Sequence, residues 1–270
     1  MMPSNSSKPM IDRKIDNKYE FLWPEFSCLL KRFGPEEDGG YVIPTSSLKE
    51  LRSVISFGVN VDWRFERHIQ KETGSTIHCY DSNDVKFLLC RFVAGGCYKL
   101  ITRKISLTDF LSRAHRLADY FIFFRGATAK ISRLYINTAT ARQIFSQMTS
   151  NTLLKCDIES SEYEILDLVC EYKEKFDVVV IEFHEADRHL MVLSEFFETM
   201  RETFAVVHLH LNNFETPNTQ GTPKIFEITF VRRTMVIPTG SAPTTLPQPL
   251  LDYPSVSCSE DIRLTNIVEW

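Results

Sequence analysis

A short run at residues 153–164 constrains the fold more than any other part of the sequence. Its first half, Leu-Leu-Lys-Cys, is apolar and typical of a strand buried on both faces of a parallel sheet. Its second half begins a helix, because Ser160 or Ser161 can cap the N-terminus while Glu162 and Glu164 complement the positive end of the helix dipole. The run therefore predicts a strand that leads directly into a helix.

Two carboxylates, Asp157 and Glu159, stand at the point where this strand gives way to the helix. Open α/β folds bind their ligands at this carboxyl edge of the sheet. Acidic residues at such a turn also serve as simple helix caps and solvated helix starts. Residues elsewhere in the chain distinguish a binding site from a simple helix cap.

Other segments of the chain favour an α/β fold with a mostly parallel sheet. Short apolar runs at residues 51–59, 76–81 and 176–183 predict buried strands, and residues 223–232 predict a last, antiparallel strand. Hydrophobic periodicity predicts helices between them. The remaining expectations are a first helix at 19–33, a third strand at 98–105, and helices at 63–73, 85–93 (ended by Gly95-Gly96), 107–118, 138–148 and 188–201.

The joint after the first predicted strand reads Gly58-Val-Asn60-Val-Asp62. A glycine there lets a ligand approach the backbone close to the N-terminus of the next helix. The joint lacks the glycine pattern and the lysine–serine pair of a phosphate-binding loop. Asp81 ends the second predicted strand about twenty residues later, where an acid accepts hydrogen bonds from ribose hydroxyls in nucleoside-binding folds. A helix N-cap is the alternative role for Asp81.

The later strands bring further polar residues to the same predicted edge. Glu182 and His184 end the strand at residues 176–183. In the following strand His208 and His210 alternate onto one face. Such a pair can ligate a metal when a carboxylate joins it, although packing is the more frequent role. Asn212 and Asn213 follow at the end of this strand.

Composition limits which binding partners and which cellular compartment we expect for the chain. The chain has 270 residues and a net charge of −4, enough apolar material for one sizeable domain at residues 19–270. Without a basic excess, we expect no nucleic-acid partner. The seven cysteines lack the spacing of metal ligands, which indicates reduced thiols. No apolar run has the length of a signal peptide or a membrane span. We therefore expect a cytoplasmic protein. Residues 1–18 are expected to be disordered and residues 238–270 to wrap over the surface.

Several of these motifs together resemble the FkbM-type methyltransferases, in the branch whose first motif reads Ser-Phe-Gly. The resemblance covers roughly residues 34–264. The motifs that carry it are Asp38-Gly-Gly-Tyr-Val-Ile-Pro, Ile55-Ser-Phe-Gly-Val-Asn-Val-Asp, Tyr80-Asp81, Leu154-Lys-Cys-Asp-Ile-Glu-Ser-Ser-Glu-Tyr-Glu, Ile181-Glu-Phe-His and His208-Leu-His-Leu-Asn-Asn.

The resemblance implies a Rossmann-like class I methyltransferase fold that binds S-adenosylmethionine and passes its methyl group to an acceptor, usually an oxygen. The first hypothesis is therefore an O-methyltransferase that acts on a small or carbohydrate-like acceptor, and we assign no metal ligands. The residues that the resemblance implies for the cofactor are Gly58, Asn60, Asp62, Asp81 and Asp157. His184 is the expected base, with Asp157 or Glu159 as the alternative. The residues expected to frame the substrate are Glu182, His208, His210, Asn212 and Asn213.

The chain departs from the family pattern at two positions. Asn60 and Ser160 stand where the motifs usually have glycine. A catalytically weakened or inactive binding module is therefore the second hypothesis. A metal-dependent hydrolase that uses Asp157, Glu182, His208 and His210 is the third. The sequence does not indicate an oligomeric state.

Overall fold

The computed structural model describes residues 10–215, 217, 222–256, 258–259 and 261–265. Its centre is a seven-stranded sheet with the order β10-β11-β9-β8-β5-β6-β7, in which β11 alone runs antiparallel to its neighbours. This order and direction confirm the predicted Rossmann-like class I methyltransferase fold. The strands are β5 (Ser53–Phe57), β6 (Thr76–Asp81), β7 (Ala129–Arg133), β8 (Thr152–Cys156), β9 (Phe176–Phe183), β10 (Phe204–Leu211) and β11 (Phe226–Arg232).

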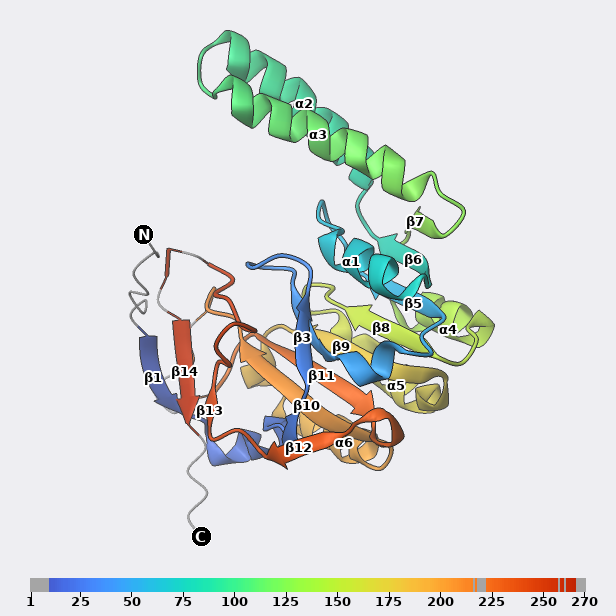
Figure 1. The fold of residues 1–270 in the computed structure, drawn as a ribbon, viewed down its shortest axis with the longest axis vertical. Helices are drawn as coiled ribbons and strands as arrows, with labels where there is room; N and C mark the ends of the chain where they lie inside the picture. The colour runs from blue at the N-terminus through green and yellow to red at the C-terminus, as the bar shows by residue number, and fades with distance from the viewer. Residues whose placement is uncertain (1–9, 216, 218–221, 257, 260, 266–270) are drawn as a thin grey trace.

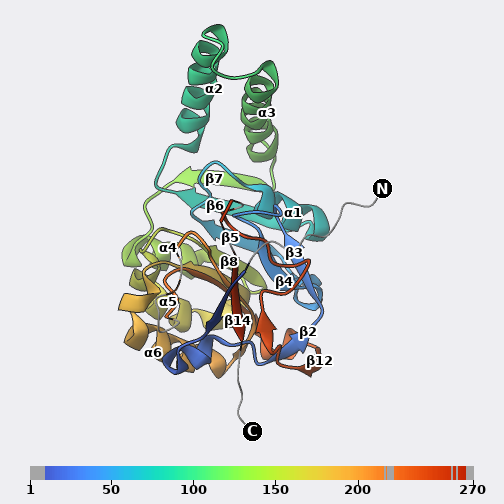
Figure 2. The ribbon, with the colours of Figure 1, turned by 90° about the vertical axis from the view of Figure 1, so that its left-hand side faces the viewer.

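Both faces of the sheet are covered, because its central strands are apolar on both sides. Every residue of β8, β9 and β10 is buried. One face packs against α4 (Thr138–Gln147), α5 (Leu166–Glu171) and α6 (Leu190–Arg201). The other face packs against α1 (Arg64–Thr73) and the antiparallel pair β3 (Leu30–Phe33) and β4 (Tyr41–Pro44), as Figure 1 and Figure 2 show together. Parallel strands with two covered faces are the arrangement that the apolar runs predicted.

Two predicted elements have a different structure. The helix expected at residues 19–33 is wrong: the segment forms a short 3-10 helix, Asn17–Leu22, followed by β2 (Phe26–Cys28) and β3. The third strand expected at residues 98–105 is also wrong, because this segment ends one helix and turns toward the next. The third parallel strand is β7, whose residues are mostly exposed and so lack the apolar signal of a buried strand.

Between β6 and β7 the chain forms a long helical hairpin of α2 (Val85–Ile101) and α3 (Leu107–Phe124). The hairpin stands away from the sheet, beyond β6 and β7 (Figure 1, Figure 2). The helix does not end at Gly95-Gly96 as predicted. A Cβ on Gly96 would lie 3.0 Å from Arg113 and 3.3 Å from Phe110, so this glycine lets the two helices approach closely. No helix in the described part of the chain has both the length and the apolar surface to cross a bilayer.

The two ends of the described chain meet in a small sheet beside the main one. β1 (Met10–Lys14) pairs in parallel with β14 (Asp261–Thr265), which also pairs with β13 (Thr245–Leu246). The expectation of disorder is therefore corrected for residues 10–18, while residues 1–9 lie outside the described residues. The C-terminal segment does more than wrap the surface, because Leu246, Ile262 and Leu264 join the core. The remaining strand, β12 (Pro238–Ser241), pairs with β2.

Buried ion pairs attach the C-terminal segment to β10. His208 Nε2 lies 2.8 Å from Asp252 Oδ1, and both side chains are almost fully buried. His210 lies between Glu227 at 3.7 Å and Asp261 at 4.0 Å. Burial lowers the pKa of His210, but the charges of Asp252, Glu227 and Asp261 outweigh burial and raise that pKa to about 9. Burial raises the pKa of Asp252, but the two histidines outweigh it and lower that pKa to about 2.

We expect Asp252→Asn to lower the free energy of unfolding at pH 7 by about 3 kcal/mol, because it removes the carboxylate that does most to raise the pKa of buried His210 and that pairs with buried His208. The His210 contribution is fully present below its ordinary pKa of 6.5 and is lost as the pH rises through about 9. Urea unfolding across this pH range should show that loss in the wild type and a smaller one in the variant. Asp167→Asn, at an exposed position, is the control. Equal stability of the two variants would contradict the assignment.

Candidate functional site

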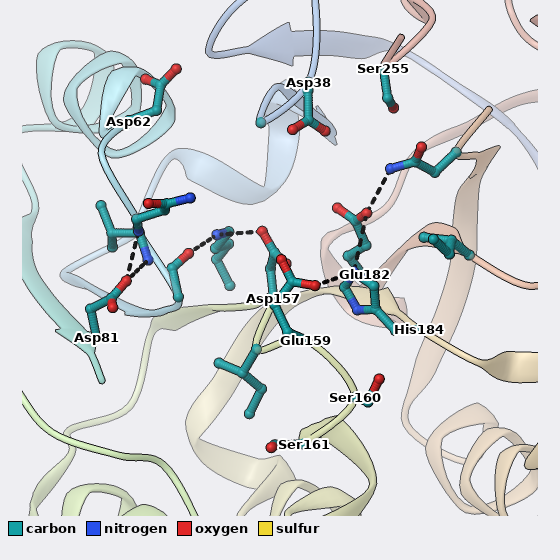
Figure 3. Close-up of a pocket in the computed structure, with 18 of the residues that line it drawn as sticks. Asp38, Asp62, Asp81, Asp157, Glu159, Ser160, Ser161, Glu182, His184 and Ser255 are labelled. Atoms are coloured by element: carbon teal, nitrogen blue, oxygen red, sulfur yellow. Dashed lines mark hydrogen bonds and ion pairs between the residues drawn. The ribbon is translucent and has the colours of Figure 1, made fainter. Parts of the chain in front are cut away.

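A cavity of about 710 Å³ opens at the carboxyl ends of β5, β6, β8 and β9. Its size is within the range of small-molecule and cofactor sites. The predicted site residues that line it are Gly58, Asn60, Asp62, Asp81, Asp157, Glu159, Glu182, His184 and Asn212, and Figure 3 shows many of them around a common space. The prediction that scattered polar groups share one edge of the sheet agrees with this arrangement.

Gly58 is required because two strand ends approach each other closely. It has a φ of 73°. A Cβ at this position would lie 1.6 Å from the carbonyl oxygen of Asp157. No side chain fits such a gap, so the glycine brings the turn after β5 against the turn after β8. Asn60, in the same turn, has a φ of 50°. Asparagine tolerates this left-handed conformation better than most residues.

A buried lysine lies between these two turns. Lys155 Nζ donates to the carbonyl oxygen of Gly58 and, at 3.1 Å, to Asp157 Oδ2. The Tyr41 hydroxyl donates to the same Asp157 oxygen at 3.1 Å. Burial alone would lower the pKa of Lys155, but the charges of Asp157 and Glu66 outweigh it and raise the pKa above its ordinary value. The lysine is therefore a fixed positive charge at the bottom of the cavity.

Asp81 holds the turn after β5 from the other side. Its Oδ2 accepts hydrogen bonds from the backbone N–H groups of Val59 and Asn60 at 3.0 and 2.7 Å, as drawn in Figure 3. Its Oδ1 accepts a third from Asn83 at 2.7 Å. An ionised carboxylate offers about four acceptor positions, so a ligand hydroxyl can still bind. Asp62 lies at the cavity rim, where Arg64 is its ion-pair partner.

The turn after β8 contains two residues in the left-handed conformation. Glu159 has a φ of 53° and Ser160 a φ of 76°. This conformation costs a residue other than glycine roughly 1–2 kcal/mol. The backbone there carries Glu159 toward His184, with its Oε2 3.6 Å from the imidazole Nε2.

Glu162 holds His184 in a defined orientation. Glu162 is fully buried, and its Oε1 lies 3.0 Å from His184 Nδ1 and accepts from the Ile158 N–H at 3.0 Å. The other ring nitrogen, Nε2, faces Glu159 and Glu182. Burial lowers the pKa of His184, but the hydrogen bond and charge of Glu162, with Asp157 and Glu159, outweigh it and raise that pKa. An imidazole held this way can accept a proton at Nε2.

Glu182 and its neighbours form a row of buried carboxylates. Asn212 donates to Glu182 Oε1 at 2.8 Å. Glu227 on β11 pairs in register with Glu182 and, on its other side, with His210. Burial, together with the charges of Asp157, Glu227 and Asp38, raises the pKa of Glu182 well above its ordinary value. Glu182 is therefore a candidate proton carrier rather than a permanent anion.

Three predicted substrate residues lie outside the cavity lining. His208 and His210 are buried beneath the C-terminal segment, so the expectation that they frame the substrate is wrong. Asn213 instead exchanges two hydrogen bonds with Val256, at 2.7 and 3.0 Å, and so positions a segment that does line the mouth. His208 and His210 lie within β10, whereas Asn212 follows the end of that strand, so only Asn212 reaches the cavity.

The ligand set of the hydrolase hypothesis does not assemble. Among the described residues, the groups whose ligand atoms lie within 4.8 Å of one another are Asp157–Glu159–His184 and Asp38–Glu182–Glu227. Neither contains His208 or His210. The described residues therefore do not bring together the four ligands of this third hypothesis.

Sequence reasoning missed four residues of the site. They are Tyr41, Glu66, Lys155 and Glu162. Glu162 was expected in a solvated helix start, yet it points inward because a 3-10 turn, Glu162–Glu164, begins the helix. Lys155 gave a usable signal, since a lysine inside an otherwise apolar strand requires a buried partner.

The cavity is strongly acidic. Among the described residues that line it, ten are Asp or Glu and three are Lys or Arg. The apolar side chains of Leu134 and Ile136 lie on the Asp81 side of the lining, after β7. This combination suits a ligand with a positive group at one end and an apolar ring at the other.

Neither a family model nor a curated protein matches this chain. Solved structures do match. They include a fibrillarin/Nop5p complex (12% identity, 67% of this chain and 72% of that chain, TM-score 0.37). Others are an rRNA methylase from Streptococcus thermophilus (7%, 69% and 89%, TM-score 0.39) and M. jannaschii TYW2 in complex with AdoMet (10%, 69% and 73%, TM-score 0.36). We assign no function from similarity at this level, and the FkbM resemblance stays a prediction.

The matches do correct one expectation. The sequence predicted a small-molecule or glycan acceptor and no nucleic-acid partner, whereas several matching structures are described as RNA methylases. Net charge does not exclude a nucleic-acid partner, because it averages over parts of opposite sign: residues 85–125 carry six net positive charges, and the rest of the chain carries −10.

We expect Ser160→Gly to raise the free energy of unfolding by about 1 kcal/mol, because glycine adopts the left-handed conformation without strain. Chemical denaturation measures this change. Ser161 has a φ of −88°, so Ser161→Gly is the matched control and should bring no gain. A loss of stability in Ser160→Gly would show that the turn is not strained.

We expect Glu162→Gln to lower the pKa of His184, because burial then acts without the carboxylate that opposes it. Titration of the imidazole signals by NMR measures the shift. Glu164→Gln removes an exposed charge from the same turn and should leave His184 unchanged. An unaltered His184 pKa in Glu162→Gln would contradict the pairing.

Proposed function

We propose that this chain is an S-adenosylmethionine-dependent methyltransferase that acts on an acceptor oxygen. One observation carries the proposal: the turn at Gly58, the carboxylate of Asp81 and the acidic turn at Asp157 surround one cavity at the carboxyl edge of a sheet with the class I strand order. Open α/β sheets bind their ligands at this edge.

The cofactor fits the chemistry of the lining. Asp81 keeps acceptor capacity for a ribose hydroxyl beside the turn that it orders. Leu134 and Ile136 offer an apolar wall for the adenine ring. The carboxylates of Asp157 and Glu159 favour a positive sulfonium. When bound, the cofactor supplies a methyl group that is already activated for transfer.

The chain then has to position the acceptor and remove its proton. His184 Nε2 faces the cavity while Glu162 holds Nδ1, so the imidazole can take a proton from a hydroxyl and remain stabilised as the cation. Glu182, held by Asn212, lies 3.8 Å from the same Nε2 and can orient the acceptor. An oxygen acceptor is proposed because it is the nucleophile that needs such a base.

A binding module without turnover is the second candidate, and the strain at Glu159 and Ser160 favours it. Both residues are in the left-handed conformation, and Ser160 stands where the motif that it resembles usually has glycine. Cofactor affinity without product formation would identify this case. The two candidates therefore differ in turnover and not in binding.

We expect calorimetry to detect binding of S-adenosylmethionine and S-adenosylhomocysteine, and Asp81→Asn to weaken it by roughly ten- to a hundredfold, because a charge-assisted acceptor is worth about 1.5–3 kcal/mol. Asp84→Asn, which keeps a capping side chain at the start of α2, is the control. No affinity in the wild type would refute the proposal, and equal affinity in the two variants would refute the role of Asp81.

We expect His184→Ala to bind the cofactor normally and to lower formation of S-adenosylhomocysteine by about a hundredfold or more across an acceptor panel that includes RNA, because a general base contributes factors of this size. Asp157→Asn should also slow turnover. His115→Ala, at an exposed position on α3, is the control. Normal methylation by both site variants would show that the catalytic assignment is wrong.

A further inference from the structure

The hairpin of α2 and α3 has a charge and a surface unlike those of the body. Residues 85–125 contain eight Lys or Arg and two Asp, whereas the rest of the chain is strongly acidic. The hairpin also holds many of the large apolar side chains that are exposed in the described structure. They are Phe87, Phe92, Tyr98, Ile101, Leu107, Leu111 and Ile122. A basic element with exposed apolar side chains is not explained by the fold or by the cavity.

The exposed apolar side chains of α2 follow a helical stripe. Phe87, Cys90, Ala94, Tyr98 and Ile101 recur at intervals of three or four residues and are all exposed. Gly96 marks the face that packs on α3. The stripe residues lie roughly 120–180° around the helix from Gly96, at about 100° per residue. α2 therefore has one apolar face for α3 and a second that nothing in the described structure covers.

The distal end of the hairpin combines both properties. Tyr98, Ile101 and Leu107 are 64, 81 and 60% exposed around the turn between the helices. The same turn carries Lys99, Arg103 and Lys104, none of which appears in an ion pair with the described residues. Apolar side chains bordered by cations are typical of elements that bind the interface of an anionic membrane.

The base of the hairpin is fixed to the body. Trp63 Nε1 donates to Asp119 Oδ2 at 2.9 Å, and Arg67 pairs with the same carboxylate. The Trp63 ring also packs edge-on against Tyr120 and Phe124. α3 has 18 residues and is about 27 Å long. A negatively charged surface bound at the distal end would therefore lie farther from the acidic body than the Debye length of about 8–10 Å. At this distance salt screens the repulsion between the surface and the body.

We infer that the distal end of the hairpin binds an anionic phospholipid surface. RNA is disfavoured as the occupant because the most exposed side chain there, Ile101, is aliphatic and cannot stack on a base. Phe92 has a cationic partner already, since the Arg113 guanidinium lies 3.9 Å from its ring centroid. Pairing with the hairpin of a second copy would bring two strongly basic elements together. An anionic bilayer matches both the cations and the aliphatic groups.

The test is sedimentation of the full chain with vesicles. We expect binding to mixed phosphatidylcholine–phosphatidylserine vesicles, weaker binding at high salt, and little binding to pure phosphatidylcholine. The triple variant Lys99→Glu, Arg103→Glu, Lys104→Glu should lose roughly a hundredfold or more in partitioning, at about 1 kcal/mol per basic residue. Its control, Lys18→Glu, Lys49→Glu, Lys71→Glu, makes the same charge change on exposed positions of the body and should retain binding.

A second pair of variants tests the apolar contribution. Ile101→Asp should weaken vesicle binding at least tenfold, while Met191→Asp, at a position on α6 that is 75% exposed, should not. Equal losses in the hairpin and body variants would overturn the inference. So would RNA binding by the hairpin without vesicle binding, or a hairpin-dependent change in oligomeric state, measured by light scattering, without vesicle binding. Each result is independent of cofactor affinity, so the inference and the proposed function can fail separately.

Discussion

The buried ammonium group of Lys155 is the interaction on which the site depends. It crosses from β8 to the turn after β5 and neutralises part of a cavity that otherwise concentrates carboxylates. Without a positive charge there, Asp157 and Glu66 would repel each other in a medium where charges are poorly screened. The lysine therefore lowers the repulsion between the carboxylates that line the cavity. Because Gly58 has no side chain, the turn after β5 can come close enough for its carbonyl oxygen to accept a hydrogen bond from the lysine.

Charged side chains on neighbouring strands continue this electrostatic coupling across the sheet, from the cavity to β10. They are Glu182, Glu227 and His210. Register places the three side chains on neighbouring strands, so the charge of Glu227 raises the pKa of both Glu182 and His210. His210 in turn faces the C-terminal segment through Asp261. The strand at residues 261–265 is thus electrostatically linked to the bottom of the cavity, although it does not line the cavity.

The sequence allowed the central strands and the shared edge to be predicted, because buried parallel strands are continuous apolar runs that end in polar residues. It did not reveal the third strand, since β7 lies near the sheet edge with exposed side chains, whereas residues 98–105 alternate by chance within helical structure. The inward turn of Glu162 depended on a 3-10 geometry that has no sequence signature of its own. The burial of His208 and His210 depended on a C-terminal segment whose path local patterns do not specify.

The parallel pairing of β1 with β14 has a consequence for synthesis on the ribosome. β1 is the first described strand to be made, and its partner is the last. At usual elongation rates the interval is on the order of tens of seconds. Throughout this time β1 presents unpaired backbone groups, which are a template for wrong pairing. The nascent chain therefore needs either rapid burial of the neighbouring Ile15 and Tyr19 against the sheet or a chaperone that shields this strand until β14 has been made.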